Sequence, residues 1–97
     1  MEERDYLVIL YDFYGELLND KHREYFEDYY FNNLSLGEIS ENTGISRNAI
    51  HKGLKSAEEK LNFYEEKLNL YKKKKLLDEY ISEIDDIQIK NKINELY

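Results

Sequence analysis

Apolar residues recur three or four positions apart along most of the chain, which is the spacing of one helix face. One such stripe covers residues 5–18, and a second, rich in tyrosine and phenylalanine, covers residues 20–31. The sequence has no proline and only four glycines, so the residues that interrupt helices and shape strand turns are scarce. The pattern therefore predicts an all-α protein whose first two helices are these stretches.

A helix-turn-helix is predicted over residues 35–55. Ser35 and Glu38 have the spacing of a capping box, in which each side chain accepts a hydrogen bond from a free backbone amide of the other residue. Gly44 suits the left-handed conformation that ends many helices, and Ser46 is placed to cap the next helix. The residues expected to face inward are Leu36 and Ile39 of the first helix and Ala49, Ile50 and Leu54 of the second. Those expected at the crossing of the two helices are small or aliphatic: Ser40, Ile45, Ala49 and Ile50.

Beyond Lys55 the helical pattern continues without a breaker, which predicts one long helix over residues 46–75. It carries an apolar seam that either folds back on the first two helices or pairs with a second copy of the chain. The seam consists of Leu61, Tyr64, Leu68 and Tyr71. A chain of 97 residues is close to the size at which small domains gain stability by association, so we expect a homodimer.

These elements suggest two parts. Residues 1–75 form the helix-turn-helix domain, and residues 76–97 form a helical tail, broken near Asp85, that packs on the core or on the dimer. Gly15 and Gly53 fall inside predicted helices, where each costs about 1 kcal/mol relative to alanine. Gly15 either admits a neighbouring helix or marks a kink.

Charge is distributed unevenly. The net charge of −7 argues against a protein that coats DNA nonspecifically, yet residues 47–75 carry nine basic and four acidic residues. This basic block begins where the second helix of the motif begins. The outward face of that helix presents side chains that can contact base edges or phosphates, although a solvated helix face has a similar pattern. These nucleic-acid-binding candidates are Arg47, Asn48, His51, Lys52 and Lys55.

No group of residues indicates catalysis, a metal site or a cofactor. The sequence lacks cysteine, and its two histidines are 29 positions apart. Neighbouring acids such as Glu58 and Glu59 point about 100° apart on a helix, so they do not form a shared site. We expect a protein that is not an enzyme. The longest aliphatic run, Leu7–Leu10, is too short to span a membrane, and the acidic start lacks the features of a signal peptide, so we expect a cytoplasmic protein without a membrane partner.

The stretch from residue 10 to residue 71 resembles the YlxM family of small bacterial helix-turn-helix proteins, which are themselves similar to region 4 of primary sigma factors. The resemblance rests on several short motifs and covers about two thirds of the chain. They are Asp12–Gly15, Asp20–Lys21 with Arg23, Tyr29–Tyr30, Ser35–Ile39, and Ile45–Arg47 with Ala49.

The resemblance implies a sigma-region-4-like helical bundle that dimerises. It also implies a regulatory or nucleic-acid-binding function connected with the signal recognition particle, because family genes lie beside the gene for the protein component of that particle. Two interpretations stay open. The protein is either a regulator that binds DNA or the structured RNA of the particle, or an interaction module whose partner is a protein, such as the particle's protein component.

Overall fold

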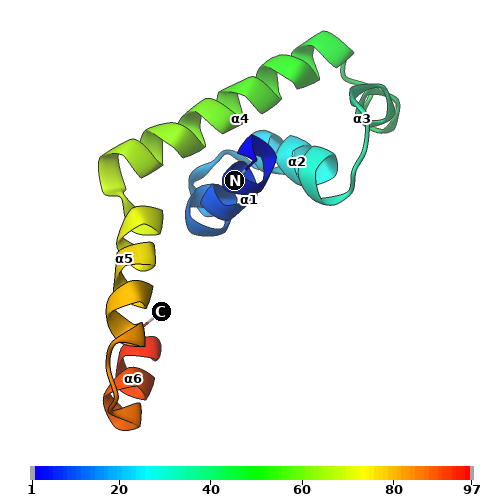
Figure 1. Ribbon diagram of the computed structural model, residues 1–97. Helices are drawn as coiled ribbons and strands as arrows, with labels where there is room; N and C mark the ends of the chain where they lie inside the picture. Colours follow the sequence, from blue (N-terminus) through cyan, green and yellow to red (C-terminus); the bar gives the residue numbers. More distant parts are fainter. Residues whose placement is uncertain (1, 97) are drawn as a thin grey trace.

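The computed structural model describes residues 2–96, and every regular element in that range is helical, which confirms the all-α prediction. The molecule is elongated, measuring 55 × 24 × 24 Å (Figure 1). Its helices are α1 (Glu3–Tyr14), α2 (Asp20–Phe26), α3 (Leu36–Thr43), α4 (Arg47–Leu68), α5 (Leu70–Ser82) and α6 (Ile87–Asn94).

The first predicted helix is shorter than expected. α1 ends at Tyr14, and residues Gly15–Leu17 form a turn of 3-10 helix. A Cβ atom at Gly15 would lie 2.9 Å from the ring of Tyr11, so the glycine leaves room for this ring where the helix tightens. Gly15 therefore marks the end of α1, and the nearest atoms to its free side are those of Tyr11.

The second predicted helix has the expected bounds but an irregular second half. The side chain of Asn19 caps α2 by accepting a hydrogen bond from the backbone N–H of His22 at 2.8 Å. After α2 the chain continues as a π-helical turn, Glu27–Phe31. The wider turn frees backbone carbonyls, and Arg4 of α1 donates to those of Tyr29 and Tyr30 at 3.3 and 3.1 Å.

α4 is the helix against which the rest of the bundle packs (Figure 1). Its middle turns meet α1 and α2 in one buried cluster, and its first turns meet α2 and α3 in another. The first cluster consists of Leu7, Leu10, Tyr14, Leu18, Phe26, Ala57 and Leu61. The second consists of Tyr25, Ile39, Ile50 and Leu54. Burying these side chains holds α3 and the start of α4 in a fixed relation to each other.

The prediction of one helix over residues 46–75 was wrong, because α4 ends at Leu68 and α5 begins at Leu70. Asn69 joins them with φ 54° and ψ 32°, a left-handed conformation that asparagine tolerates better than most residues. The apolar spacing continues across the break, which explains why the pattern did not reveal it. The expected division after residue 75 therefore falls inside α5.

A buried pair of side chains stabilises the break. Glu65 accepts hydrogen bonds from the backbone N–H groups of Tyr71 at 3.1 Å and Lys72 at 3.2 Å, and from the hydroxyl of Tyr14 at 2.6 Å. The same hydroxyl accepts a bond from the N–H of Leu70 at 3.0 Å. Burial and the neighbouring carboxylate raise the pKa of Tyr14 to about 12. The first turn of α5 is thus capped by residues of α1 and α4.

α5 and α6 extend away from the bundle as an arm, and the chain reverses between them (Figure 1). The break expected near Asp85 is confirmed, since Asp86 caps α6 by accepting from the N–H groups of Gln88 at 2.8 Å and Ile89 at 3.2 Å. Ile81 is the one buried residue of the two helices within the described range. Several large apolar residues of the arm stay exposed: Leu70, Leu76, Tyr80, Ile87, Ile89 and Leu96.

Candidate nucleic-acid interface

The helix-turn-helix is built by the caps that the sequence predicts. Ser35 Oγ accepts from the N–H of Glu38 at 3.1 Å, and the Glu38 carboxylate accepts from the N–H of Ser35 at 3.1 Å. Gly44 ends α3 with φ 74°, and Ser46 Oγ accepts from the N–H of Ala49 at 3.2 Å. These bonds fix where each helix of the motif begins and ends.

Thr43 adds a bridge across the turn. Its hydroxyl donates to the carbonyl of Ile39 at 2.7 Å and accepts from the N–H of Ile45 at 3.2 Å. Thr43 is half-buried, and its hydroxyl gives a hydrogen-bond partner to one backbone group on each side of Gly44.

The prediction for one residue at the crossing of the two helices, Ala49, was wrong. Ala49 is exposed, whereas Ile50 is fully buried, because adjacent helical residues point about 100° apart. The small residue that close packing requires is Gly53, where a Cβ atom would lie 2.8 Å from the ring of Tyr25. The glycine in the middle of α4 therefore allows α2 to approach closely.

All five candidate residues lie on the exposed surface of the first turns of α4: Arg47, Asn48, His51, Lys52 and Lys55. Among the described residues, none of the five side chains makes a hydrogen bond or an ion pair, so their polar groups are available to a ligand. At 1.5 Å per residue the group extends for about 12 Å along the helix. We call these five residues the basic stripe.

The basic stripe ends within one turn after Lys55. Glu58, which accepts a hydrogen bond from Tyr30 at 2.7 Å, and the exposed Glu59 and Glu66 follow it on α4. A phosphate would be repelled by these later carboxylates. The later turns of α4 thus carry charges of both signs, since Lys60 and Lys67 also lie there, and the uninterrupted basic surface is limited to the first two or three turns.

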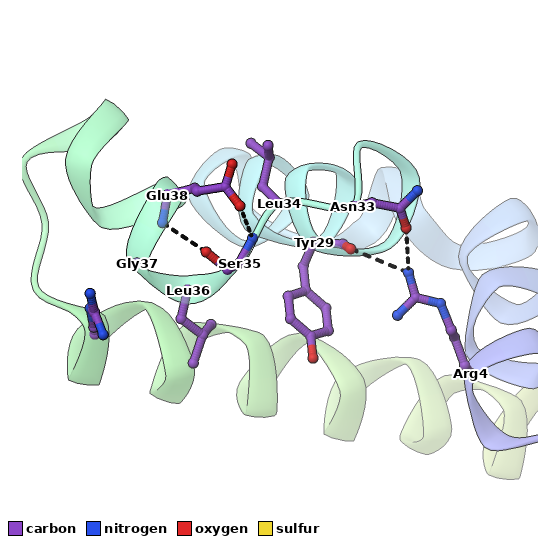
Figure 2. Close-up of a pocket in the computed structure, with 9 residues that line it drawn as sticks. Arg4, Tyr29, Asn33, Leu34, Ser35, Leu36, Gly37 and Glu38 are labelled. Atoms are coloured by element: carbon purple, nitrogen blue, oxygen red, sulfur yellow. Dashed lines mark hydrogen bonds between the residues drawn. The ribbon is translucent and has the colours of Figure 1, made fainter.

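Arg47 lies closer to α3 than the sequence suggests. A Cβ atom at Gly37 would come within 2.7 Å of its guanidinium, so the glycine makes room for the arginine against the first turn of α3. Arg47 and Arg4 both line an adjoining hollow of about 620 Å³. Figure 2 shows Arg4 and the first turn of α3 among the residues that line this hollow. Arg4 is engaged structurally, since it also donates to the Asn33 side chain at 3.1 Å. Arg47 thus stands at the edge of the basic stripe.

A second hollow lies between α2 and α4 and has a volume of about 700 Å³. Lys21 and His22 of α2 line it together with Lys52 of the basic stripe. Burial, and to a lesser degree the positive charge of Lys60, lowers the pKa of His22. The sequence analysis did not count Lys21 among the nucleic-acid-binding candidates, because only the packing of α2 on α4 brings it to the same hollow as a residue 31 positions away.

The four residues of the predicted seam differ in how deeply they are buried. Leu61 is fully buried in the core of the chain, and Tyr64 and Tyr71 pack against that core, while the side chain of Leu68 is 45% exposed. The seam thus folds back on the first two helices at three of its four positions. Leu68 is the most exposed of the four seam residues, and Tyr64 and Tyr71 are partly buried.

Within residues 2–96, no helix combines the length and apolar character needed to cross a membrane.

Comparison with known proteins identifies the family. The family described as "Putative helix-turn-helix protein, YlxM / p13 like", UPF0122, matches residues 1–96. A UPF0122 protein of Caldanaerobacter subterraneus is 58% identical over 59 residues, which is 61% of this chain and 50% of that protein. The matched part thus spans about half the length of that relative.

Two other relatives match over more of their length. The UPF0122 protein of Malacoplasma penetrans is 39% identical over 89 residues, covering 92% of this chain and 83% of the relative. That of Listeria welshimeri is 38% identical over 104 aligned positions, covering 98% of this chain and 94% of the relative. The family is one of helix-turn-helix proteins and not a family of enzymes. The chain, with its capped helix-turn-helix and its long α4, belongs to the UPF0122 family of YlxM/p13-like proteins.

Proposed function

We propose that this protein is a regulator that binds double-stranded DNA by placing the first turns of α4 in the major groove. The observation that carries the proposal is the basic stripe, whose five side chains are exposed and make no bond within the described part of the chain. An α-helix with its side chains is about 10–12 Å in diameter, which fits the major groove of B-form DNA, about 12 Å wide.

The side chains of the basic stripe are suited to two kinds of contact, with base edges and with phosphates. Asn48 is suited to bidentate hydrogen bonds with adenine, whereas lysine and arginine pair with guanine or with phosphates. Arg47 lies beside α3 at the edge of the stripe, and this position supports the proposal that it contacts a backbone phosphate and not a base. Lys21 lines the same hollow as Lys52, which adds a cation on the α2 side.

Duplex geometry favours DNA over RNA. The major groove of A-form RNA is deep and narrow, so a protruding helix cannot read its base edges. A helix-turn-helix that presents α4 outward is therefore better matched to B-form DNA. The structured RNA of the signal recognition particle, which the family resemblance suggests, is the appropriate competitor in the same assay.

Fluorescence anisotropy with labelled random duplexes, at about 50 and 200 mM salt, tests the proposal. Changing Arg47, Lys52 and Lys55 to alanine together should abolish most binding and lower the slope of log affinity against log salt by up to about 3, roughly one for each phosphate that is no longer neutralised. The matched control changes Lys67, Lys90 and Lys92 to alanine, which removes the same charge elsewhere. Absence of binding at low salt, or an equal loss in the control, contradicts the proposal.

The runner-up function is a protein-interaction module, and the exposed acidic surface of the first two helices favours it. The exposed acids of this part of the chain are Glu3, Asp5 and Asp12 of α1, Glu16 of the 3-10 turn, and Asp20 and Glu24 of α2. Such a surface suits a basic protein partner by electrostatic complementarity. Retention on the protein component of the signal recognition particle after nuclease digestion supports this function, whereas loss of retention after digestion supports nucleic-acid binding.

A further inference from the structure

The break between α4 and α5 replaces the hydrogen bonds of a continuous helix one for one. In an unbroken α-helix the N–H groups of residues 70–72 would donate to the carbonyls four positions earlier. Here the first of them donates to the Tyr14 hydroxyl at 3.0 Å, and the other two donate to the Glu65 carboxylate at 3.1 and 3.2 Å. The helical pattern resumes at Lys73, whose N–H donates to the Asn69 carbonyl at 2.8 Å. All three donors therefore have a partner whether the helix is broken or continuous.

The sequence around the break is compatible with a continuous helix. Residues 61–82 contain neither glycine nor proline, and the apolar spacing at positions 61, 64, 68 and 71 continues across the junction. Asn69 has a φ of 54°, a left-handed conformation that is less favourable for an L-amino acid than the right-handed helical one. The bend therefore depends on residues that are distant in the chain.

Few side chains hold the bent form. Tyr14 is fully buried and Glu65 is 8% exposed, and the hydroxyl donates to the carboxylate at 2.6 Å. The ring of Tyr71 packs against those of Tyr6 and Phe13 in α1, with centroids 5.8 and 6.2 Å away. Within residues 2–96, Tyr71 is the one residue of the arm that packs against the buried clusters of the bundle.

We propose that the junction of α4 and α5 is a hinge with two positions, and that Tyr14 and Glu65 form its latch. In the bent form the latch holds the amides of residues 70–72. In the straight form Asn69 is helical, and α4 and α5 become one helix over residues 47–82, about 54 Å long. Two arrangements with the same number of satisfied donors form the kind of bistable element on which conformational switches are built.

The hinge determines which surfaces the protein presents. In the bent form Tyr71 covers Tyr6 and Phe13, and it lines a hollow of about 530 Å³ between α1 and α5. Straightening uncovers these two aromatic residues of α1 and moves the arm away from them (Figure 1). A partner that binds only one form shifts the population toward that form. The motion does not depend on the proposed DNA binding, and it is measured without nucleic acid.

Double electron–electron resonance between two spin labels measures the position of the hinge. The sequence has no cysteine, so Ala49→Cys and Glu79→Cys, both at exposed positions, provide unique labelling sites. They lie 30 positions apart, which corresponds to about 45 Å in the straight form and to a shorter distance in the bent form. An excess of unlabelled chain suppresses distances between chains. The labelled protein should give mainly the shorter distance.

The latch variant adds Tyr14→Phe and Glu65→Ala to the labelled chain, because either residue alone still holds part of the junction. Most molecules should then give a distance of about 45 Å, and circular dichroism should show that the helix content is kept. The matched control, Tyr64→Phe with Glu66→Ala, changes a neighbouring tyrosine and an exposed acid and should keep the shorter distance. A folded latch variant that keeps the shorter distance, or that lacks a peak near 45 Å, overturns the proposal.

Asn69 provides a second test that leaves Glu65 in place. In the Tyr14→Phe background, where the latch is weakened, Asn69→Ala should raise the ratio of straight to bent molecules about tenfold, since alanine disfavours the left-handed conformation. Asn69→Gly should lower this ratio, because glycine accepts that conformation readily. If the latch variant does not fold, this pair decides, and equal distance distributions for the two Asn69 variants overturn the proposal.

Discussion

Removal of one oxygen atom from Tyr14 tests how the arm is attached to the bundle. The Tyr14 hydroxyl donates to Glu65 at 2.6 Å and accepts from the N–H of Leu70 at 3.0 Å, while the ring itself is fully buried. Tyr14→Phe keeps the ring and removes both bonds. It leaves the Leu70 N–H and one carboxylate lone pair without their partner.

The expected cost can be estimated from these two hydrogen bonds. A hydrogen bond to a charged group contributes about 1.5–3 kcal/mol, and a donor left unpaired adds to the loss, so Tyr14→Phe should lower the free energy of unfolding by about 2–3 kcal/mol. Urea denaturation followed by circular dichroism at pH 7 measures this quantity. Tyr64→Phe is the matched control, because Tyr64 packs beside the Tyr14 ring and its hydroxyl has no hydrogen bond within residues 2–96.

The pH dependence provides a second test of the same bond. The pKa of Tyr14 is raised from 10.0 to about 12 in the folded protein. When the pKa of a group is higher in the folded than in the unfolded protein, the group stabilises the fold fully at a pH below its unfolded pKa. For Tyr14 this stabilisation is lost as the pH rises from 10 to 12. The difference in unfolding free energy between wild type and Tyr14→Phe should therefore shrink over that range. The role of the Tyr14 hydroxyl would be refuted if Tyr14→Phe and Tyr64→Phe lowered the free energy of unfolding equally. It would also be refuted if the difference in this free energy between wild type and Tyr14→Phe did not change with pH.

Three further substitutions test the packing of the helix-turn-helix. Gly53→Ala gains about 1 kcal/mol of helix propensity but forces the Tyr25 ring to move, at a cost of about 1–3 kcal/mol, so thermal unfolding should not shift upward. Thr43→Val removes the bridge to Ile45 and should lower the free energy of unfolding by about 1–2 kcal/mol in urea denaturation, whereas an unchanged value would contradict the bridge. His22 has a lowered pKa, so stability should fall as pH drops below 6.5, and His22→Gln should make that decline less steep.

Local features of the fold could be predicted because their partners are close in sequence. The capping box joins Ser35 to a residue three positions away, and Gly44 and Ser46 act on the turn that contains them. The exposure of Lys52 and Lys55 followed from helical periodicity in the same way. These predictions needed only the spacing of residues along one helix.

The features that the sequence did not reveal depend on residues distant in the chain. The break at Asn69 is stabilised by Tyr14, which lies 56 positions from Leu70, and its only local signal is the asparagine itself, a weaker helix terminator than glycine or proline. Gly53 appeared only as a weak point of a helix until α2 was placed against it. The site was therefore predictable as an exposed basic helix face, but its neighbours Lys21 and Gly37 were not.

The proposed hinge and the proposed DNA surface lie at different ends of α4. Lys55, the last residue of the basic stripe, precedes Asn69 by 14 positions, or about 21 Å along the helix. The α4 residues of both buried clusters end at Leu61, so they stay in place when the arm moves. Changing Tyr14 and Glu65 together should therefore move the arm and leave the DNA affinity unchanged. If the affinity falls as the label distance grows, the two ends of the protein are coupled. Measuring both quantities on one variant separates movement of the arm from recognition through α4.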